Sequence, residues 1–205
     1  LIGHGAGRPS ASTAPSGGSV VAPPSRSEVG WMTDAGRVRD HNEDTALVFT
    51  AAQDGDNSLP SFGLFVLADG MGGHRAGEKA SSIAARVAAY HIARQSYLPS
   101  LLDRERDATQ PALTEVLIDS VRAANKAVSQ EAPGSGTTLI CALVVGSQAY
   151  IAHVGDSRAY LLTKGGLEQI THDHSIVHRL VDLGQLTLNE AAEHLQGLQQ
   201  TVGDH

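Results

Sequence analysis

The sequence predicts an α+β fold, because strand-like and helix-like segments come in blocks rather than in the strict alternation of a parallel sheet. Strand-like segments come first, two helix-like segments follow, and a second block of strands precedes a last helical part. The chain has 205 residues, of which 41% are hydrophobic and 18% charged, which suits one globular domain with a sizeable core.

The first block holds three expected strands. EVGWMTDAG (28–36) is a short one, and DTALVFTA (44–51) and SFGLFVLA (61–68) are separated by a turn-rich stretch that favours a hairpin. Ahead of them, residues 1–28 are dominated by Gly, Pro, Ser and Ala. We expect this stretch to be a disordered linker, because it has too little apolar surface to bury.

Two amphipathic helices are predicted next. Residues 77–96 repeat apolar side chains at helical spacing, and Pro111 opens a second helix over 111–132. The second block of strands follows at 137–146, 149–156 and 157–163, with the turn Gly165-Gly166 leading into LEQIT. Residues 175–187 and 189–197 again have helical spacing.

Composition excludes several classes of function. The net charge of −7 argues against binding to a nucleic acid backbone, and no apolar run is long enough to cross a bilayer. The single cysteine, Cys141, lies in an apolar run and is interpreted as a buried hydrophobe. One cysteine cannot form a disulfide framework, so the redox compartment is open and the cytoplasm is the default location. Because the chain begins on Leu1, we expect it to be a piece of something longer.

Two aspartates mark the ends of the expected hairpin. If 44–51 and 61–68 pair, Asp44 lies opposite Asp69, with Cβ atoms roughly 5 Å apart. Two bare carboxylates at that distance repel, and a divalent cation between them removes the repulsion. Oxygen ligands favour Mg²⁺ or Mn²⁺, and Gly70 leaves its carbonyl free to turn toward the ion. The alternative is that both aspartates simply end strands and face water.

Other polar residues stand near these ends. Arg39 could bind a phosphoryl group above the metal or be an exposed loop residue. Asp156 ends another strand, although Gly-Asp-Ser is also an ordinary turn. A loop histidine beside a metal-bound phosphate could act as a general acid or be solvated; the candidates are His41, His74, His172 and His174. SGTT (135–138) reads as a structural turn.

Five segments in this order resemble the metal-dependent protein phosphatases, the type 2C serine/threonine family, in its bacterial form. They are VRDHNED, LADGMGG, SGTT, VGDSRAYLL and ITHDHSIV, and the resemblance covers about residues 29–192. It implies an α-β-β-α sandwich of two antiparallel sheets flanked by helices. It also implies hydrolysis of phosphoserine and phosphothreonine in proteins, by attack of a metal-bound water at a two-metal Mg²⁺/Mn²⁺ site. The expected partners are phosphorylated proteins, including serine/threonine kinases and their substrates.

The resemblance also implies roles for single residues. Arg39 matches the catalytic arginine that holds the substrate phosphate. Among the metal ligands, Glu43 and Asp44 match the acidic pair, Asp69 the aspartate that bridges the two ions, and Gly70 the carbonyl ligand beside it. Asp156 is similar to the aspartate that helps hold a third, weaker ion in many members. Animal members place their general acid where this chain has Met71, and His74 is a nearby but displaced candidate.

The chain departs from the family pattern after Ala192. The later Asp-Gly and Asp-Asn pairs of the family are not found, and Asp204 has no apolar strand before it. We therefore expect 29–205 to be a phosphatase domain incomplete at its C-terminal end, weakly active or inactive by itself. One alternative is a catalytically degenerate relative that binds or regulates phosphoproteins. Another is an unrelated Mg²⁺-dependent hydrolase, which would explain the carboxylates but not the order of the motifs.

Overall fold

A computed structural model describes residues 28–37, 40–53, 59–72, 75–102 and 110–173. Over residues 44–169 the strands and helices come in blocks in the order that the sequence predicts. The elements are β1 (Asp44–Ala51), β2 (Phe62–Met71), α1 (Arg75–Ile92), the π-helical turn η1 (Ala93–Tyr97), α2 (Leu98–Ser100), α3 (Leu113–Glu131), β3 (Gly136–Thr137), β4 (Leu139–Val145), β5 (Gln148–Val154), β6 (Tyr160–Thr163) and β7 (Gly166–Gln169).

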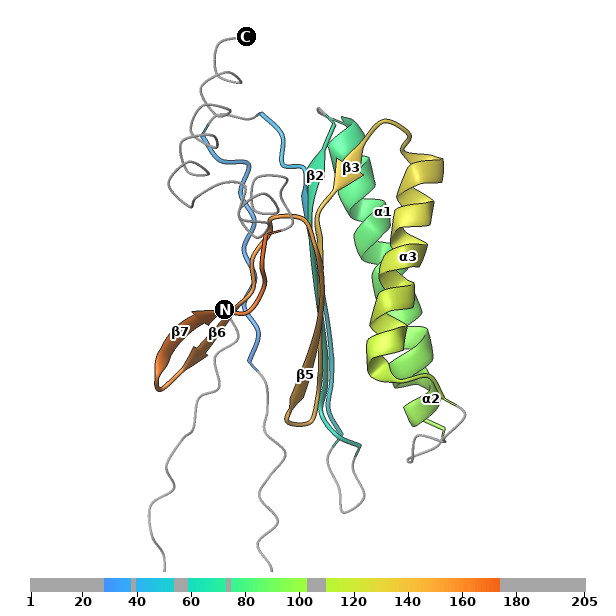
Figure 1. The fold of residues 1–205 in the computed structure, drawn as a ribbon, viewed down its shortest axis with the longest axis vertical. Helices are drawn as coiled ribbons and strands as arrows, with labels where there is room; N and C mark the ends of the chain where they lie inside the picture. The colour runs from blue at the N-terminus through green and yellow to red at the C-terminus, as the bar shows by residue number, and fades with distance from the viewer. Residues whose placement is uncertain (1–27, 38–39, 54–58, 73–74, 103–109, 174–205) are drawn as a thin grey trace, which may run out of the picture.

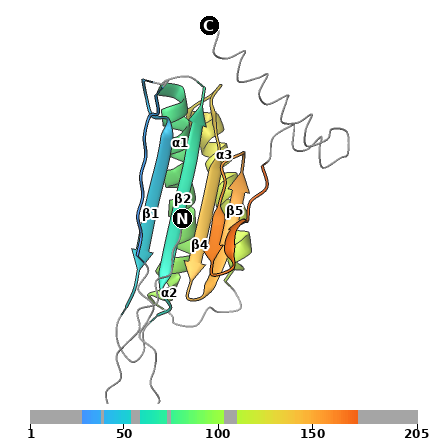
Figure 2. The ribbon, with the colours of Figure 1, turned by 90° about the vertical axis from the view of Figure 1, so that its left-hand side faces the viewer.

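The strands form a five-stranded antiparallel sheet and a separate two-stranded hairpin. The order in the larger sheet is β1-β2-β4-β5, with β3 paired to the end of β2, and β6 pairs with β7. Helices α1 and α3 pack side by side on one face of the larger sheet, and β6–β7 lies on the other side (Figure 1). Figure 2 shows the sheet from this second side, with β1 at one edge and β5 at the other.

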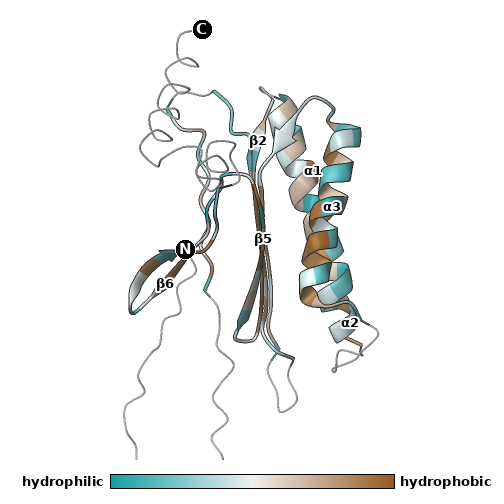
Figure 3. Cartoon of the chain, in the orientation of Figure 1, coloured by the Kyte–Doolittle hydropathy of each residue, from teal (hydrophilic) through white to brown (hydrophobic). Residues whose placement is uncertain are grey.

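The hydrophobic core lies between the sheet and the helix pair. On β2 the side chains of alternate positions, from Phe62 to Ala68, are buried against the helices. The expected helix stripes are also buried there, and Figure 3 shows the apolar faces of α1 and α3 turned inward and their polar faces outward. Strand period and helix period thus agree on one core, as the sequence predicts.

The second helix begins two residues later than expected. Pro111 lies just outside it, Ala112 is the N-cap, and the Ala112 N–H donates to the carboxylate of Glu115 at 3.2 Å. This is half of a capping box, because alanine has no side-chain acceptor for the return bond. None of the described helices combines the length and the hydrophobicity that a membrane span requires.

The strand expected at residues 28–36 is wrong. Residues 28–37 run without strand pairing past the sheet face opposite the helices, where Val29, Trp31 and Met32 help to line an open groove. A strand needs a hydrogen-bonding partner, and no described strand offers this segment one. The expected linker lies outside the described residues up to residue 27, and so do the expected helical segments at 175–187 and 189–197.

Candidate metal centre at one end of the sheet

Antiparallel pairing brings four chain segments to one end of the sheet. β1 starts there, β2 ends there, β4 starts there and β5 ends there, as the pairing of Asp44 with Asp69, of Leu67 with Ile140 and of Leu139 with Val154 shows. Asp44 at the start of β1, Asp69 near the end of β2 and Asp156 just after β5 therefore lie at the same end of the sheet, although more than a hundred residues separate the first from the last.

Asp44 and Asp69 are direct partners across the β1–β2 pair, which confirms the register predicted from the hairpin. Both side chains are exposed. Strand alternation places both on the sheet face opposite the helices, because the half-buried neighbour Thr45 contacts Ser81 of α1 and the buried neighbour Ala68 lies in the core. Two carboxylates on one face, roughly 5 Å apart at Cβ and open to solvent, repel each other, and a cation bound between them would remove this repulsion.

Glu43 lies on the helix side of this pair. Its backbone carbonyl accepts a hydrogen bond from the Gly70 N–H at 3.1 Å, which extends the β1–β2 pairing by one step. Its side chain lies against the first turns of α1, where a Cβ added to Gly77 would be 2.1 Å from Glu43 Oε2. A carboxylate close to a helix N-terminus is electrostatically favourable.

Gly70 is packed so closely against other backbone segments that it has no room for a side chain. A Cβ on this residue would lie 2.2 Å from the Gly77 carbonyl oxygen and 2.8 Å from the Glu43 carbonyl oxygen. These neighbours are backbone atoms that cannot rotate away. The absence of a Cβ at Gly70 is therefore a packing requirement, which lets α1 approach the sheet directly behind Asp69.

Asp156 lies in the loop that follows β5, and Thr138 connects this loop to the end of β2. Thr138 Oγ1 lies 2.7 Å from Ser157 Oγ and accepts the Asp69 N–H at 3.0 Å. Gly155 has φ +106°, a conformation that favours glycine, and packs against the Thr138 side chain. The loop of Asp156 and the strand end of Asp69 are thus fixed to the same buried threonine.

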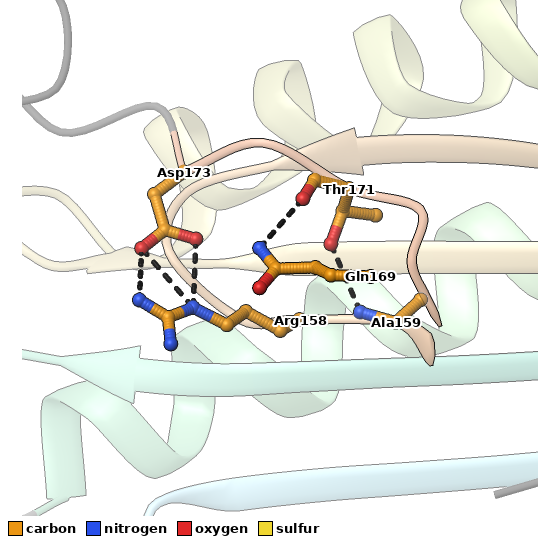
Figure 4. Close-up of polar contacts among 5 residues, drawn as sticks. All are labelled: Arg158, Ala159, Gln169, Thr171 and Asp173. Carbon is orange, nitrogen blue, oxygen red and sulfur yellow. Dashed lines mark hydrogen bonds and ion pairs between the residues drawn. The ribbon is translucent and has the colours of Figure 1, made fainter. Parts of the chain in front are cut away.

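The other side of this loop is held by an ion pair. Arg158 Nε and Nη2 donate to the two oxygens of Asp173 at 3.0 Å and 2.6 Å, and the Asp173 side chain is 7% exposed (Figure 4). The hydrogen bonds to Asp173 raise the pKa of Arg158 above its usual range. Thr171 adds a second anchor, since its hydroxyl accepts the Ala159 N–H at 2.9 Å.

The donor chemistry of the opposed pair fits a hard divalent cation. Carboxylate oxygens are the ligands that Mg²⁺ and Mn²⁺ prefer, and the Asp44 and Asp69 side chains are both accessible. Within the described residues, however, no third acidic, histidine or cysteine side chain joins them closely enough to make a group of three. Arg39 and His74, and also His174, lie outside the described residues.

Three contacts of this region are not evident from sequence reasoning. SGTT is interpreted as a turn, yet Thr138 makes the hydrogen bonds that join two segments of the site. Gly77 is interpreted as an ordinary helix residue, yet the Glu43 side chain packs against it. Asp173 lies in one of the motifs, but the sequence does not indicate that it pairs with Arg158. The one available signal is the position of small or hydroxyl residues beside each candidate acid. It does not reveal which distant residue they contact.

A family model described as Protein phosphatase 2C matches residues 31–180. This match covers most of the chain and includes every segment of the candidate centre. The chain belongs to the protein phosphatase 2C family. Membership confirms the resemblance drawn from the five motifs and rules out the unrelated hydrolase.

Curated members of the protein phosphatase 2C family from bacteria are similar over most of the chain. A serine/threonine phosphatase stp of Listeria monocytogenes is 40% identical over 174 residues, which covers 80% of this chain and 61% of the relative. Serine/threonine protein phosphatase PstP of Mycobacterium tuberculosis is 38% identical over 170 residues, covering 80% of this chain and 28% of the relative. The chain thus spans less than two thirds of these relatives.

Solved structures of the family share the fold. A crystal structure of Mycobacterium tuberculosis PstP/Ppp aligns with a TM-score of 0.54 at 38% identity, over 78% of this chain and 60% of that one. The catalytic domain of PstP in complex with two manganese ions aligns with a TM-score of 0.53 at 37% identity, over 78% and 61%. The expected α+β class with two antiparallel sheets and helices is confirmed.

Proposed function

We propose that this chain forms part of a protein serine/threonine phosphatase that uses Mn²⁺ or Mg²⁺. The observation that supports this proposal most strongly is the direct pairing of Asp44 with Asp69 at one sheet end, in a family where a similar solved structure binds two manganese ions. Its substrates are phosphoserine and phosphothreonine in proteins. Serine/threonine kinases and their targets are the proposed partners, and the cytoplasm is the proposed location.

We propose the following roles for the residues that match the family motifs. Asp44 and Asp69 would hold the cations from the open face of the sheet, with the Gly70 carbonyl as a further ligand and Glu43 acting partly through water. Asp156 would contribute to a third, weaker ion. Divalent cations at such a centre supply Lewis-acid activation of water and neutralise phosphate charge. Arg39 would bind the substrate phosphate, and His74 is the candidate general acid.

Phosphate release from a phosphothreonine peptide tests the proposal. We expect the full-length gene product to release phosphate in the presence of Mn²⁺ and to stop when EDTA removes it. Asp69→Asn should lower kcat/KM by at least about 100-fold, because it removes a ligand and leaves the opposite carboxylate alone. Asp119→Asn is the matched control, since Asp119 is an exposed residue of α3 that pairs only with Arg122 in the described ion pairs.

Equal rates for wild type and Asp69→Asn would contradict the metal role of Asp69. A second candidate function, phosphoprotein binding without turnover, is favoured by one observation, which is that the described residues bring only two acidic side chains together. Tight binding of the phosphopeptide with no Mn²⁺-dependent release would support that alternative.

A further inference from the structure

Thr138 is the point at which two segments of the candidate metal centre meet. It sits between β3 and β4, at the sheet end, and is only 1% exposed. Its backbone N–H donates to the Asp69 carbonyl at 2.9 Å, and its hydroxyl oxygen accepts the Asp69 N–H at 3.0 Å. Both backbone polar groups of Asp69 are therefore bonded to this one residue.

The same hydroxyl reaches the loop that carries Asp156. Thr138 Oγ1 lies 2.7 Å from Ser157 Oγ, the residue directly after Asp156. Because the Asp69 amide can only donate, the threonine oxygen accepts there and still has a proton for Ser157. A single buried hydroxyl thus carries a hydrogen-bond chain from one strand end to the loop at another.

The methyl group of Thr138 holds the loop from a second direction. A Cβ added to Gly155 would lie 2.7 Å from Thr138 Cγ2 and 2.9 Å from Thr138 Cβ, so the loop backbone lies directly on this side chain. A β-branched side chain has restricted χ1 freedom, which keeps hydroxyl and methyl in their separate roles. Valine would retain the methyl contact alone, and serine would retain the hydroxyl alone.

We propose that Thr138 is a positioning residue of the metal centre, which fixes the strand end carrying Asp69 and the loop carrying Asp156 relative to each other. The proposal rests on the proposed function, because it assigns the two aspartates to one centre. Removal of a group that hydrogen-bonds to a metal-binding residue, without contacting the metal, commonly lowers metal affinity by about 10- to 100-fold. A hydrogen bond needed only for folding would not act on metal affinity in this way.

Calorimetric titration of Mn²⁺ into the metal-free full-length gene product tests this role. Thr138→Val should weaken Mn²⁺ binding by at least about 10-fold, and Thr138→Ser should stay within about threefold of wild type because it keeps the hydroxyl. Ser120→Ala is the matched control: Ser120 is fully buried and its hydroxyl donates to Leu117 O in α3, away from the centre. Its loss should leave Mn²⁺ affinity unchanged.

Ser157→Ala provides a second test, because it removes the hydrogen bond between Thr138 and Ser157 while leaving both Thr138–Asp69 hydrogen bonds in place. We expect it to weaken Mn²⁺ binding too, and to add little in the Thr138→Val background, since the two variants break the same link. Should Thr138→Val fail to fold, Ser157→Ala alone decides: unchanged Mn²⁺ affinity in that variant overturns the proposal.

The failures of the two proposals can be told apart. If wild type binds Mn²⁺, Asp69→Asn does not, and Thr138→Val binds like wild type while unfolding more easily in EDTA, the positioning role is wrong and the proposed metal centre stands. If wild type binds no Mn²⁺, the proposed function fails and the role of Thr138 fails with it.

Discussion

Gly70 is enclosed by backbone atoms of two other segments, so the site has no space for a side chain at this position. The Gly77 and Glu43 carbonyl oxygens would lie 2.2 Å and 2.8 Å from a Cβ at this position. The sequence suggests that this glycine leaves its carbonyl free for a cation. The structure adds a requirement for close approach, because helix α1 lies directly behind it.

Substitution of Gly70 by alanine should therefore destabilise the protein. We expect Gly70→Ala to lower the free energy of unfolding by about 1–3 kcal/mol, the usual cost of overpacking, in urea titrations without metal. Gly30→Ala is the control, because a Cβ there would meet no atom within 4 Å. Equal stability of the two variants would contradict the packing described here.

In strand β4, burial in the core changes the pKa of a cysteine side chain. Cys141 faces the core between its strand partners Val66 and Ala152, and burial raises the pKa of its thiol from 9.0 to about 12. This agrees with its interpretation as a buried hydrophobe. The folded protein keeps the thiol proton at a pH where the unfolded chain has lost it.

This pKa shift predicts a loss of stability in alkali. Above pH 9 the unfolded state binds fewer protons than the folded state, so the free energy of unfolding falls as pH rises toward 12, by up to about 1.4 kcal/mol per pH unit. Below pH 9 both states hold the proton and the effect vanishes. Urea titrations at pH 8, 9 and 10 should show a steeper fall for wild type than for Cys141→Ala, and identical slopes would refute the burial of this thiol.

The elements differ in how far sequence predicts them. The strands β1 and β2 and the helices α1 and α3 follow from strong periodicity, and the pairing of Asp44 with Asp69 follows if the two strands form a hairpin, as they do. The strand expected at 28–36 fails because strand formation depends on a partner that local sequence does not supply. The contacts of Thr138 and Asp173 join segments far apart in the chain, which no local pattern reveals.

The whole molecule has two unlike sheet faces. Helices α1 and α3 cover one face (Figure 1), whereas the opposite face carries an open groove of about 370 Å³. Residues 28–32 and the start of β6 also line this groove, and apolar residues of the four neighbouring strands β1, β2, β4 and β5 form its floor. The floor includes Val48, Phe65, Leu67, Ile140, Ala142 and Val144.

That second face is also the one on which Asp44 and Asp69 stand. Ala46 and Leu67, which help to line the groove, are paired with each other two residues along from the Asp44–Asp69 pair, so the two aspartates lie beside the groove rather than on the helix side of the sheet. Sequence predicts the two aspartates and their pairing. Their place at the edge of an apolar face follows from the antiparallel strand order, which only the three-dimensional structure supplies.

Mn²⁺ titration of Asp44→Asn, Asp69→Asn and the double variant, beside wild type and Asp119→Asn, tests the central claim that the opposed pair shares a cation. If both carboxylates bind the same ion, each single variant should weaken Mn²⁺ binding by at least about 10-fold, and the double variant should be much less affected than the sum of the two changes in binding free energy. Wild-type affinity in either single variant, or strictly additive losses in the double variant, would contradict a shared cation.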